Sequence, residues 1–145
     1  MKKIKGGVTA AKGYEAAATA AGIKYKDRTD MAMVYSKVPC VAAGTFTTNV
    51  VKAAPVKWDQ QVVASGAGIA NACTGAEGFG YCEDTAKAAA EMLGISKDGV
   101  LLGSTGVIGK QMPMDKLIAG VEVLAGKKND SIESGNEAAK AIMTT

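Results

Sequence analysis

Short apolar stretches separated by polar residues fill the chain from Ala16 to about Val63. The stretches "ATAAGIKY", "MAMVYS", "CVAAGTFTT" and "QVVASG" are rich in small or β-branched residues, and Lys, Asp, Pro and Gly lie between them. In "MAMVYS" the Met and Tyr side chains alternate with Ala and Val, which is the period of a strand. This pattern predicts a succession of strands that form a sheet.

Beyond a glycine-rich region the pattern becomes helical. Residues 83–93, "EDTAKAAAEML", start with acidic side chains, continue with strong helix formers and precede Gly94, which suits a left-handed cap. The next apolar run, "GVLLGS" (residues 99–104), predicts a short buried strand leading into the loop "GSTGVIGK" (residues 103–110). We therefore expect this loop at a strand-to-helix turn.

Two further helices are predicted towards the end of the chain. The first has Pro113 and Asp115 in its first turn and ends at Gly126, and the second spans roughly 133–143. The side chains expected to face the core are Leu117, Ile118, Val121 and Leu124 in the first helix, and Ala138, Ala139 and Ile142 in the second. Strands followed by mixed helices and strands favour a layered α/β fold, in one domain spanning residues 1–145.

Composition agrees with a globular protein built on small side chains. The 145 residues are 48% hydrophobic but only 5% aromatic, and the net charge of +3 is spread along the chain. A nucleic-acid surface would need clustered Lys and Arg, so we expect no nucleic-acid partner. The basic opening "MKKIK" lacks the apolar stretch of a signal peptide, and no run of 18 apolar residues follows. We expect a cytoplasmic protein without membrane association.

The reactive side chains exclude several kinds of site. The sequence has no histidine, and Cys40, Cys73 and Cys82 lack the C-x-x-C spacing of a metal site. We therefore expect no bound metal, and neither a Ser-His-Asp nor a Cys-His arrangement within this chain. The neighbours of Cys73 in "NACTG" carry no positive charge that would lower the pKa of its thiol. Cys73 is therefore not expected to be a nucleophile.

The glycines of "GSTGVIGK" raise the question of phosphate binding. A phosphate loop, G-x-x-x-x-G-K-[ST], needs a glycine where Ser104 stands and a hydroxyl where Gln111 stands. The stretch "GAGIAN" likewise lacks the third glycine of a dinucleotide fingerprint. Two interpretations stay open: a tight turn that glycine permits, or an anion pocket in which backbone N–H groups and the Thr105 hydroxyl stabilise an oxyanion.

Several stretches taken together resemble one family, the ornithine acetyltransferases of arginine biosynthesis. The matching pieces are "GGVTAAKGY", "VAAGTFTTN", "VKAAPV", "IANACTGAEG", "STGVIG" followed by "MPMDK", and the final "AIMTT". They occur in the family's order and cover nearly the whole chain, which is far more specific than one glycine-rich loop. The resemblance implies a layered α/β sandwich of the N-terminal-nucleophile type, of which this chain is the α-chain portion.

The resemblance also implies a reaction. The family's precursors cleave themselves before an internal threonine, and this new N-terminal Thr of the β chain takes an acetyl group from N-acetylornithine and passes it to glutamate. In bifunctional members acetyl-CoA can also donate the acetyl group. By this resemblance Thr105 and Gly106 form the oxyanion hole, and Thr144 or Thr145 contacts substrate. The missing histidine agrees, because an N-terminal Thr can use its own α-amino group as base.

The expected partners follow from the same resemblance. They are the β chain of the same precursor, in an α2β2 heterotetramer, and the two amino-acid substrates, with no cofactor besides acetyl-CoA as a co-substrate. The sequence stops at Thr145, before the nucleophile, so the isolated chain is predicted to be inactive. In "VVASGAGIANACTG" Ala64 stands where the family usually has Asn. The alternative function is a non-catalytic small-molecule binding or assembly module with the same fold.

Overall fold

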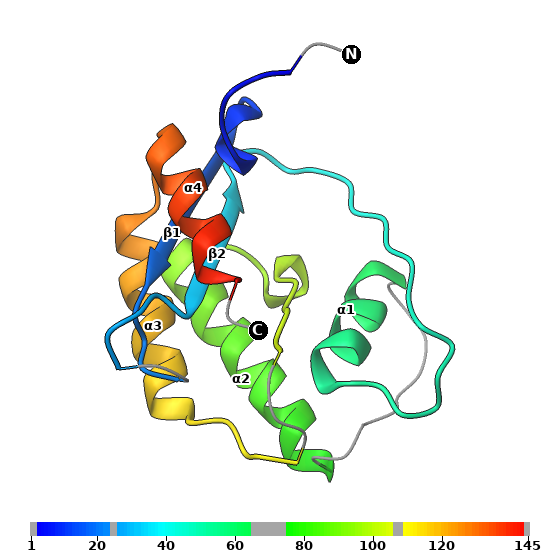
Figure 1. The fold of residues 1–145 in the computed structure, drawn as a ribbon. Coiled ribbons are helices and arrows are strands. Elements are labelled where there is room, and N and C mark those ends of the chain that lie inside the picture. The colour runs from blue at the N-terminus through cyan, green and yellow to red at the C-terminus, as the bar shows by residue number, and fades with distance from the viewer. Residues whose placement is uncertain (1–2, 24–25, 65–74, 106–108, 144–145) are drawn as a thin grey trace. The chain divides into compact units, whose positions relative to one another are not determined.

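The structure is a computed structural model, and it describes residues 3–23, 26–64, 75–105 and 109–143 (Figure 1). The chain divides into two compact units. The first takes its described residues from Met1–Cys40 and Asp115–Thr144, and the second takes them from Val41–Met114. The prediction of one domain over residues 1–145 is not decided by this division and stays a prediction.

The first unit is built on an antiparallel hairpin of β1 (Tyr14–Thr19) and β2 (Met31–Ser36). Its register pairs Tyr14 with Ser36 and Thr19 with Met31. Consecutive strand residues point to opposite faces, and Ala16 and Ala17 are both buried, so both faces of β1 are covered. Alanine suits this position because its small side chain lets elements approach closely on each side.

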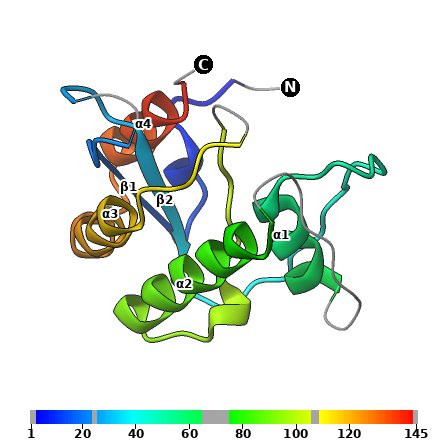
Figure 2. The same cartoon turned by 90° about the horizontal axis from the view of Figure 1, so that it is seen from below.

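Two helices complete the first unit: α3 (Met114–Lys127) and α4 (Ile132–Ala141). In Figure 1, α4 lies across the hairpin and packs on both strands. Figure 2 shows α3 alongside the strands, where Gly120 approaches the thioether of Met31. Between the helices the backbone of Asn129 bridges to Ala16, with N···O distances of 2.9 and 3.1 Å. A short 3-10 helix, η1 (Val8–Ala10), packs against α4.

The second unit is mainly helical. It contains α1 (Ala54–Ala64), α2 (Gly75–Leu93) and the 3-10 helix η2 (Lys97–Gly99). The helices α1 and α2 contact each other around one apolar cluster. Gly94 follows α2 with φ of 66°, and the Ile95 amide donates to the Ala90 carbonyl at 3.0 Å. This confirms the left-handed cap predicted from the sequence.

The predicted strands are only partly correct. Strand β2 matches "MAMVYS", whereas β1 ends at Thr19 and so begins and ends earlier than "ATAAGIKY". The stretch "QVVASG" is wrong as a strand, because its described part, residues 61–64, is the end of α1. "CVAAGTFTT" is wrong too: residues 41–48 form no regular element, and Val41 is fully exposed. The strand preference of two β-branched residues, Val62 and Val63, is weaker here than the helical preference of a segment whose apolar side chains recur every four residues.

The helices were predicted more accurately, apart from one buried face. The predicted helices at 83–93, 113–126 and 133–143 correspond to α2, α3 and α4, although α2 already begins at Gly75, in the glycine-rich region that was not expected to be helical. In α3, Leu117, Val121 and Leu124 are buried as expected, whereas Ile118 is only half-buried. In α4 the buried residues are Gly135, Ala138 and Ala141. Ala139 and Ile142 are exposed, which contradicts their predicted inward positions, because close approach to η1 favours the face that carries glycine.

Candidate active-site segment

The backbone of residues 100–105 leads into the predicted oxyanion pair and is held by α1. The indole Nε1 of Trp58 donates to the carbonyl oxygen of Val100 at 2.8 Å. The amide of Leu102 donates to Oδ1 of Asp59 at 2.7 Å. Two adjacent residues of one helix therefore bind two backbone groups of this segment. These bonds replace the sheet partners expected for "GVLLGS", which forms no strand and leaves Leu101 half-exposed.

An apolar cluster beneath the segment fixes the position of α1. Its buried members are Ala54, Trp58, Cys82 and Ala86, from α1 and α2. Val62, Phe79, Val100 and Leu102 pack against them. The rings of Trp58 and Phe79 lie with centroids 5.9 Å apart and planes inclined by 55°, a favourable tilted arrangement. Val100 and Leu102, two residues apart, thus both pack against the cluster, and this packing fixes the register of residues 100–105 against α1.

Burial changes the acid–base properties of two groups at this cluster. Loss of solvation raises the pKa of Asp59 above its ordinary value, and the bond from the Leu102 amide opposes this by stabilising the carboxylate. Burial, with a further contribution from the Asp59 charge, raises the pKa of Cys82 to about 11. Cys82 is therefore a protonated thiol near neutral pH and a packing residue rather than a nucleophile.

Thr105 lies at the free end of the anchored segment. Thr105 is exposed, as are Gly103 and Ser104. Gly106 lies outside the described residues, so the predicted pairing of Thr105 with Gly106 is not tested. The expected strand-to-helix turn is wrong, because no strand precedes Thr105 and α3 begins only at Met114. A helix N-terminus therefore does not directly follow the described part of this loop.

The chain beyond the loop returns to α2. The side-chain amide of Gln111 donates to Oε2 of Glu77, in the first turn of α2, at 2.9 Å. Lys110 is exposed and is not in a helix. The segments on both sides of residues 106–108 are therefore tied to the helices of the second unit.

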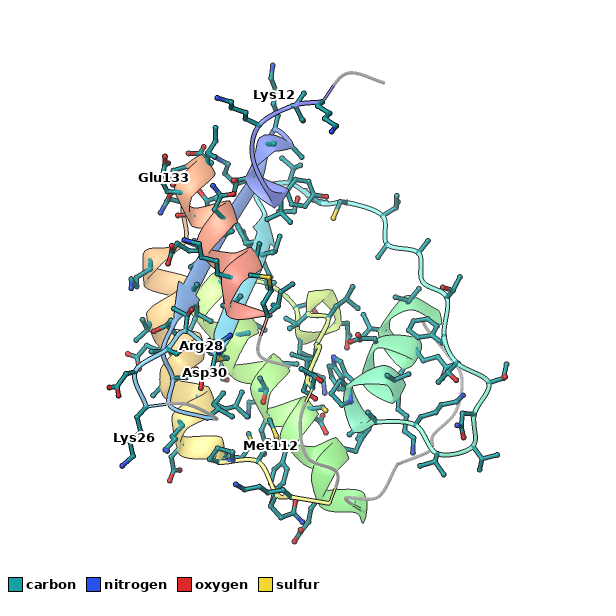
Figure 3. All side chains as sticks on the ribbon, in the orientation of Figure 1. Lys12, Lys26, Arg28, Asp30, Met112 and Glu133 are labelled. Atoms are coloured by element: carbon teal, nitrogen blue, oxygen red, sulfur yellow. The ribbon has the colours of Figure 1, made fainter. Side chains whose placement is uncertain are left out.

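The other predicted substrate contacts, Thr144 and Thr145, lie outside the described residues. The residue before them, Met143, accepts a hydrogen bond at its backbone carbonyl from the guanidinium of Arg28. Figure 3 labels Arg28 beside Asp30, whose carboxylate accepts from the amides of Ala21 and Ile23 at 2.8 and 2.7 Å. The turn between β1 and β2 thus contacts the end of the described chain.

Other parts of the motifs that resemble the family offer less chemistry. In "TFTTN" the hydroxyl of Thr47 accepts from the Asn49 amide, and the Asn49 side chain accepts from Val51, which is the hydrogen bonding of a polar turn. The stretch with Asn71, Cys73 and Thr74 lies outside the described residues. Within the described ranges no cluster of three His, Cys, Asp or Glu side chains could hold a metal. No helix among those residues is both long and apolar enough to cross a membrane.

Comparison with solved structures defines the class of this fold. The chain superposes on a crystal structure of ornithine acetyltransferase from Mycobacterium tuberculosis with a TM-score of 0.89 and 45% identity, over 97% of this chain and 80% of that chain. An arginine biosynthesis bifunctional protein ArgJ from Bacillus halodurans gives a TM-score of 0.86 and 36% identity, over 97% and 76%. The predicted α/β fold, that of the ornithine acetyltransferases, is confirmed.

Sequence comparison identifies the family. The model of the ArgJ family matches residues 15–145. A relative named arginine biosynthesis bifunctional protein ArgJ, from Streptomyces coelicolor, is 48% identical over 147 aligned residues, which cover 95% of this chain. This chain belongs to the ArgJ family. It spans 38% of the length of that Streptomyces relative, and the same share of the one from Symbiobacterium thermophilum.

Sequence reasoning missed Trp58 and Asp59. Both lie in "APVKWDQ", just before the stretch "QVVASG" that its β-branched residues predict as a strand. The available signal was helical: Ala54, Trp58 and Val62 recur every four residues, and Pro55 suits the first turn. That period would have placed Trp58 on a buried face, although the hydrogen bonds to residues 100–102 depend on tertiary contacts.

Proposed function

We propose that this chain is the α portion of an acetyltransferase of arginine biosynthesis, and that it supplies the oxyanion hole through Thr105 and Gly106. The nucleophile is the N-terminal Thr of a complementary β chain from the same precursor, released by self-cleavage. The acetyl group moves from N-acetylornithine, or from acetyl-CoA, to glutamate. Membership of the ArgJ family and the ordered motifs support this assignment.

The chemistry requires a donor set of this kind. Attack of the Thr hydroxyl on the acetyl carbonyl forms the new C–O bond and moves the carbonyl electron pair onto oxygen, while the α-amino group of the nucleophile takes the hydroxyl proton. Collapse of this intermediate breaks the C–N bond to ornithine, whose amine leaves with that proton. Two fixed donors aimed at the oxyanion lower the barrier for this step and for the later transfer to glutamate.

The observation that carries the proposal is the anchoring of the segment before Thr105. Val100 and Leu102 are bound by α1, while the Thr105 side chain is exposed. A donor that follows an anchored backbone and is still accessible to a substrate suits an oxyanion hole, because a preorganised dipole costs little reorganisation during reaction. A turn with a purely structural role would not need an exposed hydroxyl at that point.

The partner and substrate contacts complete the proposal. Thr144 or Thr145 carries the substrate contact, and the β chain forms an α2β2 heterotetramer with this chain. Val41 and Val50 are 100% and 91% exposed, in a segment without regular structure, which supports a partner that covers them. No cofactor other than the acetyl donor is part of the proposal.

Replacement of Thr105 by alanine tests the role of this donor. In the enzyme assembled from this chain and its complementary β chain, Thr105→Ala should lower kcat by about 10²- to 10³-fold, as loss of one oxyanion donor does elsewhere. Steady-state kinetics with N-acetylornithine and glutamate would measure this. Ser104→Ala is the matched control, because it removes a neighbouring exposed hydroxyl and should keep kcat within about threefold of the unmodified enzyme.

Near-normal kcat in Thr105→Ala would overturn the role of Thr105. Equal losses in Thr105→Ala and Ser104→Ala would also count against it, because they would point to general disruption of the loop. If the assembled protein binds N-acetylornithine but transfers no acetyl group, the non-catalytic binding module becomes the better description.

A further inference from the structure

Neighbouring residues of α1 bind the active-site segment in a pattern that resembles a strand pair. Trp58 donates to the carbonyl of Val100, and Asp59 accepts from the amide of Leu102. Residues at i and i+2 of an extended chain offer their backbone groups on the same edge. The adjacent side chains of Trp58 and Asp59 therefore take the place of a neighbouring strand. Together they fix the position of residues 100–102 along α1 and the direction in which their backbone groups point.

The geometry points to a function for this arrangement: we infer that Asp59 and Trp58 are positioning residues that hold the oxyanion donor at Thr105 in its productive place. This inference rests on the proposed function. Thr105 is three residues beyond Leu102, within about 10 Å even for a fully extended chain. An error in the direction of the segment at Leu102 is therefore carried directly to the donor.

Contacts around the segment make Asp59 the more critical of the two residues. Trp58 is also held by the apolar cluster, so its ring stays in place without the Nε1 bond. The Leu102 amide, in contrast, is oriented by the Asp59 carboxylate, and Leu102 is the last residue of the segment that packs against the cluster. Residues 103–105 are exposed. Asp59 thus binds the final anchored residue before the donor.

Partial burial of Asp59 agrees with a positioning role. Desolvation raises the pKa of this carboxyl, so its charge is held in unfavourable surroundings. An apolar or amide side chain would avoid this desolvation cost. A charged acceptor nevertheless binds the Leu102 amide more strongly than a neutral one, and so restricts the segment more tightly.

Three substitutions separate positioning from stability. Asp59→Ala removes the acceptor, Asp59→Asn keeps an acceptor oxygen at the same place, and Trp58→Phe keeps an aromatic ring but removes the donor. In the assembled enzyme, Asp59→Ala should lower kcat by about 10- to 100-fold with KM changed less than about threefold, since a misplaced donor affects the transition state more than substrate binding. Asp59→Asn should restore kcat to within about threefold of the unmodified enzyme.

Val62→Ala is the matched control. Val62 packs against the same cluster but makes neither of the two hydrogen bonds, so its truncation loosens α1 without releasing the segment. Its midpoint of thermal unfolding should fall at least as much as that of Asp59→Ala, while kcat stays near normal. Hydrogen exchange of the peptide covering residues 100–105 should speed up in Asp59→Ala and remain slow in Asp59→Asn.

A double substitution distinguishes failure of this inference from failure of the proposed function. If Asp59 acts through Thr105, adding Asp59→Ala to Thr105→Ala should cost much less activity than Asp59→Ala alone. A large loss in Thr105→Ala with normal kcat in Asp59→Ala overturns the inference and leaves the proposed function intact. Normal kcat in Thr105→Ala overturns the proposed function. Additive losses, or a kcat in Asp59→Asn as low as in Asp59→Ala, also overturn the inference.

Discussion

Single side chains at the α1–α2 cluster combine packing with chemical constraint. Trp58 is buried to 3% exposure and still uses its only polar hydrogen on Val100. Cys82 lies in the same cluster as an apolar residue whose thiol is held protonated. Asp59, next in sequence to Trp58, is only partly buried and keeps its charge close to apolar neighbours. The ionisation of Asp59 and the reactivity of Cys82 can each be measured.

The raised pKa of Asp59 predicts how stability depends on pH. An acid whose pKa is higher in the folded than in the unfolded protein destabilises the fold when ionised, so stability is lost as pH rises from about 3.8 through the folded pKa. Asp59→Asn removes this loss. The difference in thermal midpoint, Asp59→Asn minus the unmodified enzyme, should therefore increase as pH rises over that range and stay constant at higher pH. A difference that falls as pH rises would contradict the assignment.

Thiol reactivity provides a second test at the level of one residue. With a pKa of about 11 instead of 9.0, Cys82 carries about one-hundredth of the thiolate of an ordinary cysteine at pH 8, and its side chain is also buried. Alkylation followed by peptide mass spectrometry should label exposed Cys40 at least about 100-fold faster than Cys82. Comparable rates for the two cysteines would show that the cluster opens readily.

At the scale of elements, the first unit depends on close backbone approach between η1 and α4. A Cβ built on Gly135 would meet Oγ1 of Thr9, and one built on Gly7 would lie 3.0 Å from the backbone of Gly135. Thr9 is itself buried and donates to the carbonyl of Ser131 at 2.9 Å. The start of α4, capped by the Ser131 hydroxyl, is therefore fitted directly against η1.

Alanine substitution of helical glycines tests this contact. Alanine favours helix over glycine, yet Gly135→Ala should lower the free energy of unfolding by about 1–3 kcal/mol because the new methyl group displaces Thr9. Gly126→Ala in α3 is the control, since nothing lies within 4 Å of its added Cβ. That variant should be stabilised by up to about 1 kcal/mol. Denaturant titration of both variants gives the comparison, and equal effects would refute the tight contact.

At the scale of the whole molecule, the chain exposes apolar surface in a segment without regular structure. Val41, Val50 and Val51 are 100%, 91% and 63% exposed between β2 and α1. Single exposed apolar residues are ordinary, but several in one extended stretch favour a protein partner. The partner that we propose to cover these residues is the complementary β chain.

The isolated chain should therefore neither transfer acetyl groups nor remain monomeric. Without an N-terminal Thr nucleophile or a histidine base in the isolated chain, no covalent intermediate forms for Thr105 to stabilise by hydrogen bonding. Incubation with N-acetylornithine and glutamate should release no ornithine, and light scattering should detect oligomers or aggregates. Measurable turnover would refute the first expectation. A well-folded monomer at high concentration would refute the second.

Local sequence determined the helices best. Strong helix formers and glycine caps act within a few residues, so α3, the second half of α2 and the Gly94 cap were predictable without knowledge of the fold, whereas the glycine-rich first two turns of α2 were not. The ordered motifs also determined the family, because their specificity lies in the residues themselves. Residues 31–36 were predictable as a strand for the same reason: their alternation is complete within six positions.

Tertiary structure decided whether the remaining apolar runs became strands. A strand needs a neighbouring chain, and "GVLLGS" finds its hydrogen-bond partners in Trp58 and Asp59 instead, while residues 41–48 pair with no described strand. The same holds for the candidate site. Thr105 was identifiable from its motif, but its anchoring depends on two side chains more than 40 residues earlier in the chain. Local pattern cannot encode that contact, because only the packing of α1 against α2 brings those side chains within hydrogen-bonding distance.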